Sequence, residues 1–245
     1  MRCIFVALAF GLFGCASTPE KEATPRVLYE EAIELHKQAN YDGANKKFEV
    51  LISTFPTSPY SRQAMVDRVY FYYLRKKYAL AVDSADRFIN THPDNPNVAY
   101  VLYMKGLSYF RDDRGILDIV GRQNPATRDP KSMQLSFQAL RELTEQYPDS
   151  PYAVDATKRM RYLINTLAEG EIHVAEYYVR RGAMLAAISR AKYVLEFYPD
   201  SVAIESAIVI LMQAYSAIGA EKARDEMRRL LEINFPDNLE LKAKK

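Results

Sequence analysis

The hydrophobic positions recur at helical spacing, and one repeated motif separates the segments that carry them. The motif places an aromatic residue or His92 before a proline and a polar turn, and its five copies are Phe55-Pro56-Thr57-Ser58-Pro59-Tyr60, His92-Pro93-Asp94-Asn95-Pro96, Tyr147-Pro148-Asp149-Ser150-Pro151-Tyr152, Tyr198-Pro199-Asp200-Ser201 and Phe235-Pro236-Asp237-Asn238. Proline disfavours a helical predecessor, and a following Ser or Asp can cap a new helix. Each copy therefore predicts a helix end and a new helix start.

The spacing of the motif matches a known helical repeat. Pro56 and Pro93 lie 37 residues apart, as do Pro199 and Pro236, close to the roughly 34-residue period of tetratricopeptide repeats. The other two gaps are 55 and 51 residues. The pattern predicts an all-α fold, a right-handed superhelix of about five tetratricopeptide-type helix pairs.

Small residues occupy one fixed place in the second helix of a pair. Counting 12 residues back from three of the prolines reaches Ala44, Ala81 and Ala187. A small side chain there allows close helix approach, and the face continues through Phe48 and Leu51, Ala85 and Phe88, and Ala191 and Val194. The third and fifth repeats match less well, with Ser136 and a shifted Ala223.

The two longer gaps have different explanations. Residues 111–130 lose the apolar periodicity and gain Gly and Pro, which predicts an inserted loop. From Ala153 to Val179 the apolar residues keep helical spacing across Gly170, which predicts one long helix. Glycine costs a helix only about 1 kcal/mol relative to alanine. The alternative is two helices hinged at Gly170.

The amino-terminal segment resembles the export signal of bacterial lipoproteins. Residues 3–13 are small or apolar but too few for a membrane-spanning helix, which predicts a signal peptide over residues 1–14. The segment ends Leu12-Phe13-Gly14-Cys15, which resembles a lipobox, although Phe13 departs from the usual small residue. The resemblance implies lipidation of Cys15 and a tether over residues 15–25, with the outer membrane favoured by Ala16. The alternative is a plain secretory signal.

The tether leads into the repeats. We expect repeats one to three over residues 26–147, repeats four and five over residues 148–237, and a solvated tail over residues 238–245. The net charge of +2 arises from 33 basic and 31 acidic residues, so no strong field indicates nucleic-acid binding. Binding surfaces must therefore be local.

Stacked helix pairs leave an extended concave surface that binds protein segments, so residues in excess of packing are the candidates. The run Tyr70-Phe71-Tyr72-Tyr73 covers every face of its helix, and Tyr60, Tyr100 and Tyr103 join it as a possible peptide groove. The second candidate is Tyr177, Arg181 and Arg190, because Tyr and Arg are frequent at interfaces. The alternatives are rings that fill gaps between helices and a solvated charged face.

Catalytic patterns are weak. His36, His92 and His173 are scattered, and both cysteines lie within the first 15 residues. Glu169, His173 and Glu176 share a helical face, but such a trio is usually solvated. No glycine-rich phosphate loop follows a strand. We therefore predict no enzyme, no metal site and no cofactor.

Several segments resemble the BamD family of lipoproteins from the outer-membrane β-barrel assembly machine. They occur in order at matching spacing and are residues 92–107, Arg128-Asp129-Pro130, Asp155-Ala156-Thr157-Lys158-Arg159, Val174-Ala175-Glu176-Tyr177-Tyr178 and Arg181-Gly182-Ala183. The likeness covers about residues 26–220 and is weakest in the last repeat and the tail.

The resemblance implies a lipid-anchored scaffold on the outer membrane that faces the periplasm. It implies that the first repeats bind the aromatic-ending targeting signals of unfolded outer-membrane proteins, at Tyr60, Tyr70, Tyr72, Tyr73, Tyr100 and Tyr103. It also implies that the later repeats bind BamA, with Arg190 at the contact and Tyr177 and Arg181 in the same region. The alternative is a periplasmic repeat lipoprotein that organises cell-envelope complexes without β-barrel clients.

Replacing the predicted lipid-bearing residue tests the anchor. Cys15→Ser removes the sulfur that would carry the acyl chains, so the protein should be released from membranes. Fractionation of cells with and without detergent measures this release. Continued detergent-dependent recovery with the membranes would contradict lipidation at Cys15.

Overall fold

The computed structural model describes residues 23–110 and 130–242. Every regular element in these ranges is a helix: α1 (Pro25–Lys37), α2 (Tyr41–Thr54), α3 (Pro59–Leu74), α4 (Tyr78–Thr91), α5 (Val98–Phe110), α7 (Pro130–Gln146), α8 (Ala153–Arg180), α9 (Met184–Phe197), α10 (Ile204–Ala217), α11 (Glu221–Asn234) and α12 (Leu239–Lys242). The predicted all-α class is confirmed. The expected signal peptide, Cys15 and residues 111–129 of the expected loop lie outside the described residues.

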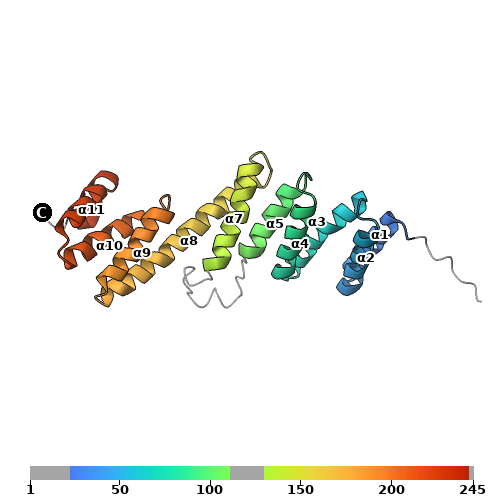
Figure 1. Ribbon diagram of the computed structural model, residues 1–245, viewed down its shortest axis with the longest axis horizontal. Coiled ribbons are helices and arrows are strands. Elements are labelled where there is room, and N and C mark those ends of the chain that lie inside the picture. Colours follow the sequence, from blue (N-terminus) through green and yellow to red (C-terminus); the bar gives the residue numbers. More distant parts are fainter. Residues whose placement is uncertain (1–22, 111–129, 243–245) are drawn as a thin grey trace, which may run out of the picture. The chain divides into compact units, whose positions relative to one another are not determined.

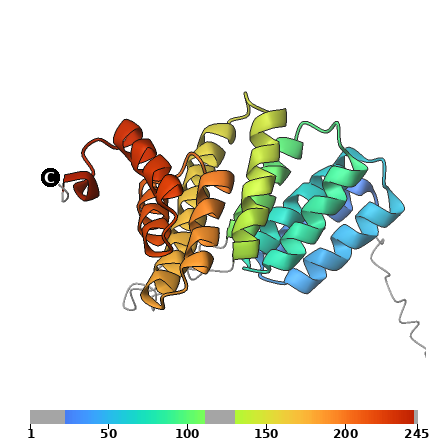
Figure 2. The ribbon, with the colours of Figure 1, turned by 60° about the vertical axis from the view of Figure 1, so that its left-hand side comes forward.

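The chain forms two compact units, residues 1–64 and 65–245, and α3 contributes to both. In the first unit α1 packs against α2. In the second unit α4, α5, α7, α8, α9, α10 and α11 pack in chain order, each against its neighbours, and α8 also touches α10 (Figure 1, Figure 2). Each helix pair of this unit therefore buries its apolar face against the next pair.

The expected small residues lie in the core. Ala44, Ala81 and Ala187 are at most 2% exposed, and the residues that continue their face are fully buried: Phe48, Leu51, Ala85, Phe88, Ala191 and Val194. Ser136 is fully buried too, and its hydroxyl donates a 2.8 Å hydrogen bond to the Gly106 carbonyl. Serine is tolerated at this position because its polar atom has a partner.

All five copies of the proline motif form the same turn. The N–H of the first residue donates to a buried residue four positions earlier, and its carbonyl accepts from the fourth residue of the motif at 3.0–3.1 Å. In four copies the side chain of this fourth residue also accepts the N–H two positions later: Ser58, Asn95, Ser150 and Asn238. The predicted helix ends are confirmed, with the fourth residue as the cap.

A second kind of turn joins the two helices within a pair. It places one residue in the left-handed region: Ala39 (φ 60°), Lys76 (φ 55°), Gly182 (φ 73°) or Gly219 (φ 71°). In all four turns the next N–H donates to the carbonyl five residues earlier at 2.9 Å, which is the Schellman arrangement. Glycine adopts this conformation freely, whereas Ala39 and Lys76 hold it at a steric cost.

The long helix predicted across Gly170 is confirmed. Helix α8 runs without interruption over 28 residues from Ala153 to Arg180. Its buried face continues on both sides of the glycine, through Ala168 and Ile172. No hinge divides the helix, so α8 joins the third pair to the fourth as one element.

The left-handed turns predict a pair of opposite stability changes. Lys76→Gly should raise the free energy of unfolding by about 0.5 kcal/mol, because the steric relief exceeds the entropy cost of glycine. Gly182→Ala should lower it by a similar amount, since no atom lies within 4 Å of the added Cβ and only the conformation is strained. Urea unfolding followed by circular dichroism measures both. A stabilised Gly182→Ala variant would contradict this account.

Candidate functional site

Three tyrosines gather where α5 meets the start of α8. Tyr100 and Tyr103 lie three residues apart on α5 and therefore on one side of it. Tyr152, which precedes α8, lies 5.5 Å from Tyr100 and 5.1 Å from Tyr103 between ring centroids, and the second pair is stacked with an interplanar angle of 22°. We call Tyr100, Tyr103 and Tyr152 the tyrosine cluster. All three rings are half-buried, so part of each faces solvent.

The cluster extends toward Tyr70 on α3. Burial is the main reason that the pKa of Tyr100 rises to about 12, and Tyr152 and Tyr70 contribute through their charges. Tyr70 is therefore close enough to Tyr100 to interact with it, and it is 40% exposed. Tyr70 thus lies in the neighbourhood of Tyr100, whereas direct ring contacts join Tyr100 and Tyr103 to Tyr152.

An acidic and a basic group fix one end of the cluster. The Tyr103 hydroxyl donates a 2.6 Å hydrogen bond to Asp155 Oδ2, and Arg159 Nε donates to the same oxygen at 2.5 Å. The guanidinium of Arg159 also lies over the Phe110 ring, 5.3 Å from its centroid. The network holds Tyr103 and Arg159 in defined positions, because charge-assisted hydrogen bonds are short and strong.

This network shifts the protonation equilibria of its members. The hydrogen bond from Tyr103 is the main cause that lowers the pKa of Asp155, and Arg159 adds to it. Burial is the main cause that raises the pKa of Tyr103, followed by the hydrogen bond to Asp155. At neutral pH the Asp155 carboxylate is charged, and Tyr100 and Tyr103 keep their protons. The cluster therefore offers hydroxyl groups and ring faces rather than a reactive phenolate.

The remaining predicted groove tyrosines lie on different faces. Tyr72 is only 8% exposed, and Arg68 donates to its hydroxyl at 3.4 Å, so little of its ring surface is open to a ligand. Tyr73 faces the α3–α4 turn, where its ring lies 5.8 Å from Tyr78. The rings of the run Tyr70-Phe71-Tyr72-Tyr73 thus point to different sides of α3. Of its three tyrosines, only Tyr70 lies near the tyrosine cluster.

Tyr60 belongs to the first unit. It is 37% exposed, and its ring centroid lies 5.7 Å from that of Tyr29 on α1. The Tyr29 ring lies in turn 6.1 Å from the buried Phe48. Tyr60 therefore covers the core of its own unit with one side of its ring and leaves the other side exposed.

The second predicted surface lies at the end of α8 and on α9. Tyr177 is 50% exposed. Arg190 Nη1 donates a 3.0 Å hydrogen bond to Glu171 Oε2, and the side chains are 46% and 23% exposed. Arg181 is exposed, and its guanidinium has no partner within the described part of the chain. We call Tyr177, Arg181 and Arg190 the arginine patch.

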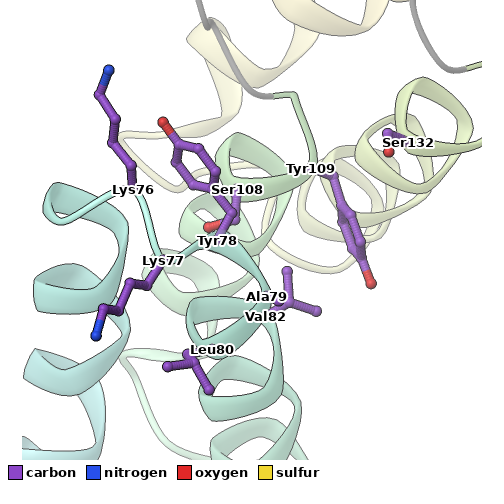
Figure 3. A pocket seen from close by; sticks show the side chains of 9 residues that line it. All are labelled: Lys76, Lys77, Tyr78, Ala79, Leu80, Val82, Ser108, Tyr109 and Ser132. Atoms are coloured by element: carbon purple, nitrogen blue, oxygen red, sulfur yellow. The ribbon is translucent and has the colours of Figure 1, made fainter.

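A separate hollow lies between the start of α4 and the ends of α5 and α7 that face it. Figure 3 shows Lys76 and Lys77 directed away from Tyr109 and Ser132. The buried Ser108 hydroxyl donates to the Met104 carbonyl at 2.8 Å and is thus satisfied. The polar groups do not converge, so this hollow adds nothing to the candidate site.

The sequence did not single out Tyr152, Asp155 and Arg159 as site residues. A signal for them was present, because Tyr152 ends the third copy of the motif and Asp155 and Arg159 are spaced four apart on a predicted helix. Their contact with Tyr103 spans 52 residues of sequence. Such a contact depends on how α8 crosses α5, which local spacing does not reveal.

Neither a metal-binding cluster nor a membrane-spanning helix occurs in residues 23–110 and 130–242. No group of three or more His, Cys, Asp and Glu is arranged there to hold a metal ion. None of the helices in these ranges combines the length and the apolar character needed to cross a membrane.

The described helices define an all-helical repeat protein. A model of the YfiO family, described as an outer membrane lipoprotein, matches residues 21–230. The outer membrane protein assembly factor BamD of Neisseria meningitidis is 38% identical over 94% of this chain and 90% of its own length. The chain therefore belongs to the BamD (YfiO) family of outer membrane lipoproteins, as its motifs predicted.

Other relatives carry the same name. The outer membrane protein assembly factor BamD of Xylella fastidiosa is 37% identical over 100% of this chain and 85% of its own length. That of Vibrio cholerae is 34% identical, with 91% and 93% covered. Among solved structures, the type IV pilus biogenesis factor PilW aligns with a TM-score of 0.36 at 16% identity over 89% of this chain and 97% of that chain, a likeness too weak to carry an argument.

Removing the Tyr103 hydroxyl, which donates a hydrogen bond to Asp155, tests the Tyr103–Asp155–Arg159 network. Tyr103→Phe should lower the free energy of unfolding by about 1 kcal/mol at pH 7, because a partly exposed hydrogen bond to a charged group is lost. In the folded protein the pKa of Asp155 lies below its ordinary value of 3.8. The hydrogen bond to the Asp155 carboxylate therefore contributes to the free energy of unfolding above pH 3.8. This contribution disappears as the pH falls through the pKa of Asp155 in the folded protein.

Urea unfolding of Tyr103→Phe and the parent from pH 3 to pH 7 measures this dependence. The difference in the free energy of unfolding between Tyr103→Phe and the parent should become smaller below pH 3.8. A matched control is Tyr147→Phe, because within residues 23–110 and 130–242 the Tyr147 hydroxyl donates to no carboxylate. A difference for Tyr103→Phe that stays constant with pH would show that Asp155 is not the responsible partner.

Proposed function

We propose that the protein is the lipoprotein scaffold of the β-barrel assembly machine, which binds BamA and the targeting signals of unfolded outer-membrane proteins for insertion. Membership of a family whose relatives are named outer membrane protein assembly factors supports this role. The protein is held to the outer membrane through Cys15 and faces the periplasm. It acts by binding and not by catalysis, in line with relatives that are named assembly factors.

The tyrosine cluster with Tyr70 is the client site, and its partly exposed rings carry the proposal. Rings packed only for stability are buried, as Tyr72 is, whereas Tyr70 keeps 40% of its surface exposed. An extended peptide that ends in an aromatic residue can place its ring against such a surface, because aromatic rings prefer tilted or offset contacts with one another. The Tyr103–Asp155–Arg159 network supports the site by fixing the rings before the peptide binds.

The arginine patch is the docking site for BamA. Arg190 is oriented by Glu171, whose carboxylate is mostly buried and lies 3.0 Å away. An oriented guanidinium loses little freedom on binding a partner carboxylate. The exposed Arg181 and Tyr177 broaden the same region, and residues of both types are enriched where interfaces are strong.

Peptide binding tests the client site. A labelled peptide with a carboxyl-terminal aromatic residue, taken from an outer-membrane β-barrel protein, should bind the purified chain more weakly by about tenfold after Tyr70→Ser with Tyr100→Ser, because ring contacts are lost. Fluorescence anisotropy measures the affinity.

The matched control is Phe197→Ser on α9, a ring that is 55% exposed and lies outside the cluster. It should leave peptide affinity unchanged. Equal effects of the two sets of changes would contradict a client site at the cluster.

Charge reversal tests the docking site. Arg190→Glu should weaken capture of the purified BamA periplasmic domains by tenfold or more, because it removes an oriented cation and places a carboxylate beside Glu171. Helicity should stay unchanged by circular dichroism. Arg228→Glu on α11 is the control, since Arg228 is also paired with a carboxylate, Glu232, at 3.1 Å. Undiminished capture by Arg190→Glu would overturn the assignment.

A further inference from the structure

The α3–α4 turn carries two positive charges on a backbone that favours glycine. Lys76 is the left-handed residue of this turn (φ 55°), whereas two of the equivalent turns have Gly182 and Gly219 there. The N–H of Lys77 donates to the Tyr72 carbonyl at 2.9 Å and closes the turn, so the backbone is fixed while both lysine side chains are exposed. A lysine at such a position has a steric cost, and residues of this kind are frequent at functional sites.

Two exposed apolar side chains flank the lysines. Leu74, the last residue of α3, is 53% exposed, and Leu80, in the first turn of α4, is 45% exposed. The core beside them is closed by Val69 and Ala81, which are fully buried, so packing does not require either leucine. We call the four exposed residues of this segment the basic turn: Leu74, Lys76, Lys77 and Leu80. Apolar and cationic side chains exposed together mark an interaction surface.

The positive charge of the basic turn is not neutralised by nearby acidic groups. The first turn of α4 contains no acidic residue, and none lines the adjoining hollow of about 580 Å³. Further along α4, Asp83 pairs with Arg87 at 3.8 Å and Asp86 pairs with Lys105 at 2.6 Å. Neither lysine of the basic turn forms an ion pair in the described part of the chain. A negatively charged partner would therefore meet two available cations.

The two ammonium groups do not converge on one point. Figure 3 shows the side chains of Lys76 and Lys77 extended in different directions, away from Tyr109 and Ser132 on the far side of the hollow. A small anion bound in a pocket needs polar groups that point at the same place. Diverging charges on long, flexible stems suit a broad surface with many negative groups. The occupant of the basic turn is therefore a surface and not a single small molecule.

We propose that the basic turn lies against the membrane surface, where Lys76 and Lys77 pair with the phosphates of anionic lipids and Leu74 and Leu80 enter the apolar boundary beneath the head groups. The chain belongs to a family of outer membrane lipoproteins, so a membrane is within reach. A lipid anchor holds a protein at a membrane but does not set its orientation. This second contact orients the second unit, and it goes beyond the proposed function because it needs neither BamA nor a client.

The residue types of the basic turn argue against a protein as the occupant. Lysine is depleted in protein–protein interfaces, whereas arginine is enriched there. Arginine offers a planar fork that matches a carboxylate, while lysine carries a compact charge on a flexible stem that can follow a fluid surface. A second copy of this chain would bring the same surface of each copy together and place like charges side by side. A bilayer that contains anionic lipids suits the turn better.

A fluorescent label at residue 79 tests the contact in the lipid-anchored full chain. Ala79 is exposed and precedes Leu80. Because both natural cysteines lie within the first 15 residues, Ala79→Cys places a single thiol in the repeats for an environment-sensitive dye. The protein is reconstituted into phosphatidylcholine vesicles with and without phosphatidylglycerol, so the anchor is the same in both.

Two signals report contact of the labelled turn with the bilayer: a shift of the dye emission to shorter wavelength, and quenching by a lipid that carries a nitroxide near its head group. Both should be stronger in vesicles with phosphatidylglycerol. Added salt should weaken them, because it screens exposed charges.

Charge reversal identifies the responsible side chains. Lys76→Glu with Lys77→Glu, in the labelled chain, should reduce the quenching to the level seen with phosphatidylcholine alone, because the new carboxylates are repelled by anionic lipids. Lys222→Glu with Arg229→Glu is the matched control, since both residues are exposed on α11 and the change in net charge is the same. The control should keep the full signal. Circular dichroism checks that all variants retain their helicity.

Three results would overturn the proposal. The first is an equal signal in the two kinds of vesicle, and the second is a signal that survives Lys76→Glu with Lys77→Glu. The third is a label that responds only when other proteins of the assembly machine are added, which would show that a protein covers the turn. The vesicles contain neither a client nor BamA, so failure here is distinguishable from failure of the proposed function.

Discussion

A pair of helices cannot bury its apolar face alone, and this constraint shapes the rest of the molecule. Neighbouring pairs must approach closely, which explains why Ala81 and Ala187 are fully buried at equivalent positions. Ser136 meets the same requirement because its hydroxyl finds the carbonyl of Gly106. Close stacking in turn fixes where each turn lies, and the turns carry the polar groups, the left-handed residues and the exposed apolar residues on which binding depends.

The aromatic residues divide between stacking and binding. Phe88 and Tyr72 are buried in the second unit, while Tyr70 and the tyrosine cluster remain partly exposed. The cluster does not depend on ring contacts alone, because Asp155 accepts hydrogen bonds from both Tyr103 and Arg159. A binding surface that is braced in this way loses less freedom when a ligand arrives. Packing of the repeats thus prepares the surface instead of competing with it.

Local pattern predicted the fold better than the site. The proline motif and the spacing of Ala44, Ala81 and Ala187 gave the helix ends and the core, since both are set within a few residues of chain. The same pattern predicted α8 across Gly170. Exposure of single rings was not predictable, because the same aromatic run contains the buried Tyr72 and the exposed Tyr70. The contact between Tyr103 and Asp155 was missed because it depends on the crossing of two helices far apart in sequence.

The unbroken helix α8 sets the spacing between the two surfaces. Asp155 braces the tyrosine cluster and Arg180 precedes Arg181 of the arginine patch, and their separation of 25 residues along the helix spans about 38 Å at 1.5 Å per residue. Those residues complete almost seven whole turns at 3.6 residues per turn, so both positions lie on nearly the same side of the helix. The helix therefore acts as a rigid spacer that keeps the tyrosine cluster and the arginine patch at one distance and in one orientation. Inserting or deleting a single residue would turn one end relative to the other by about 100°, whereas changes of about a full turn would preserve their alignment.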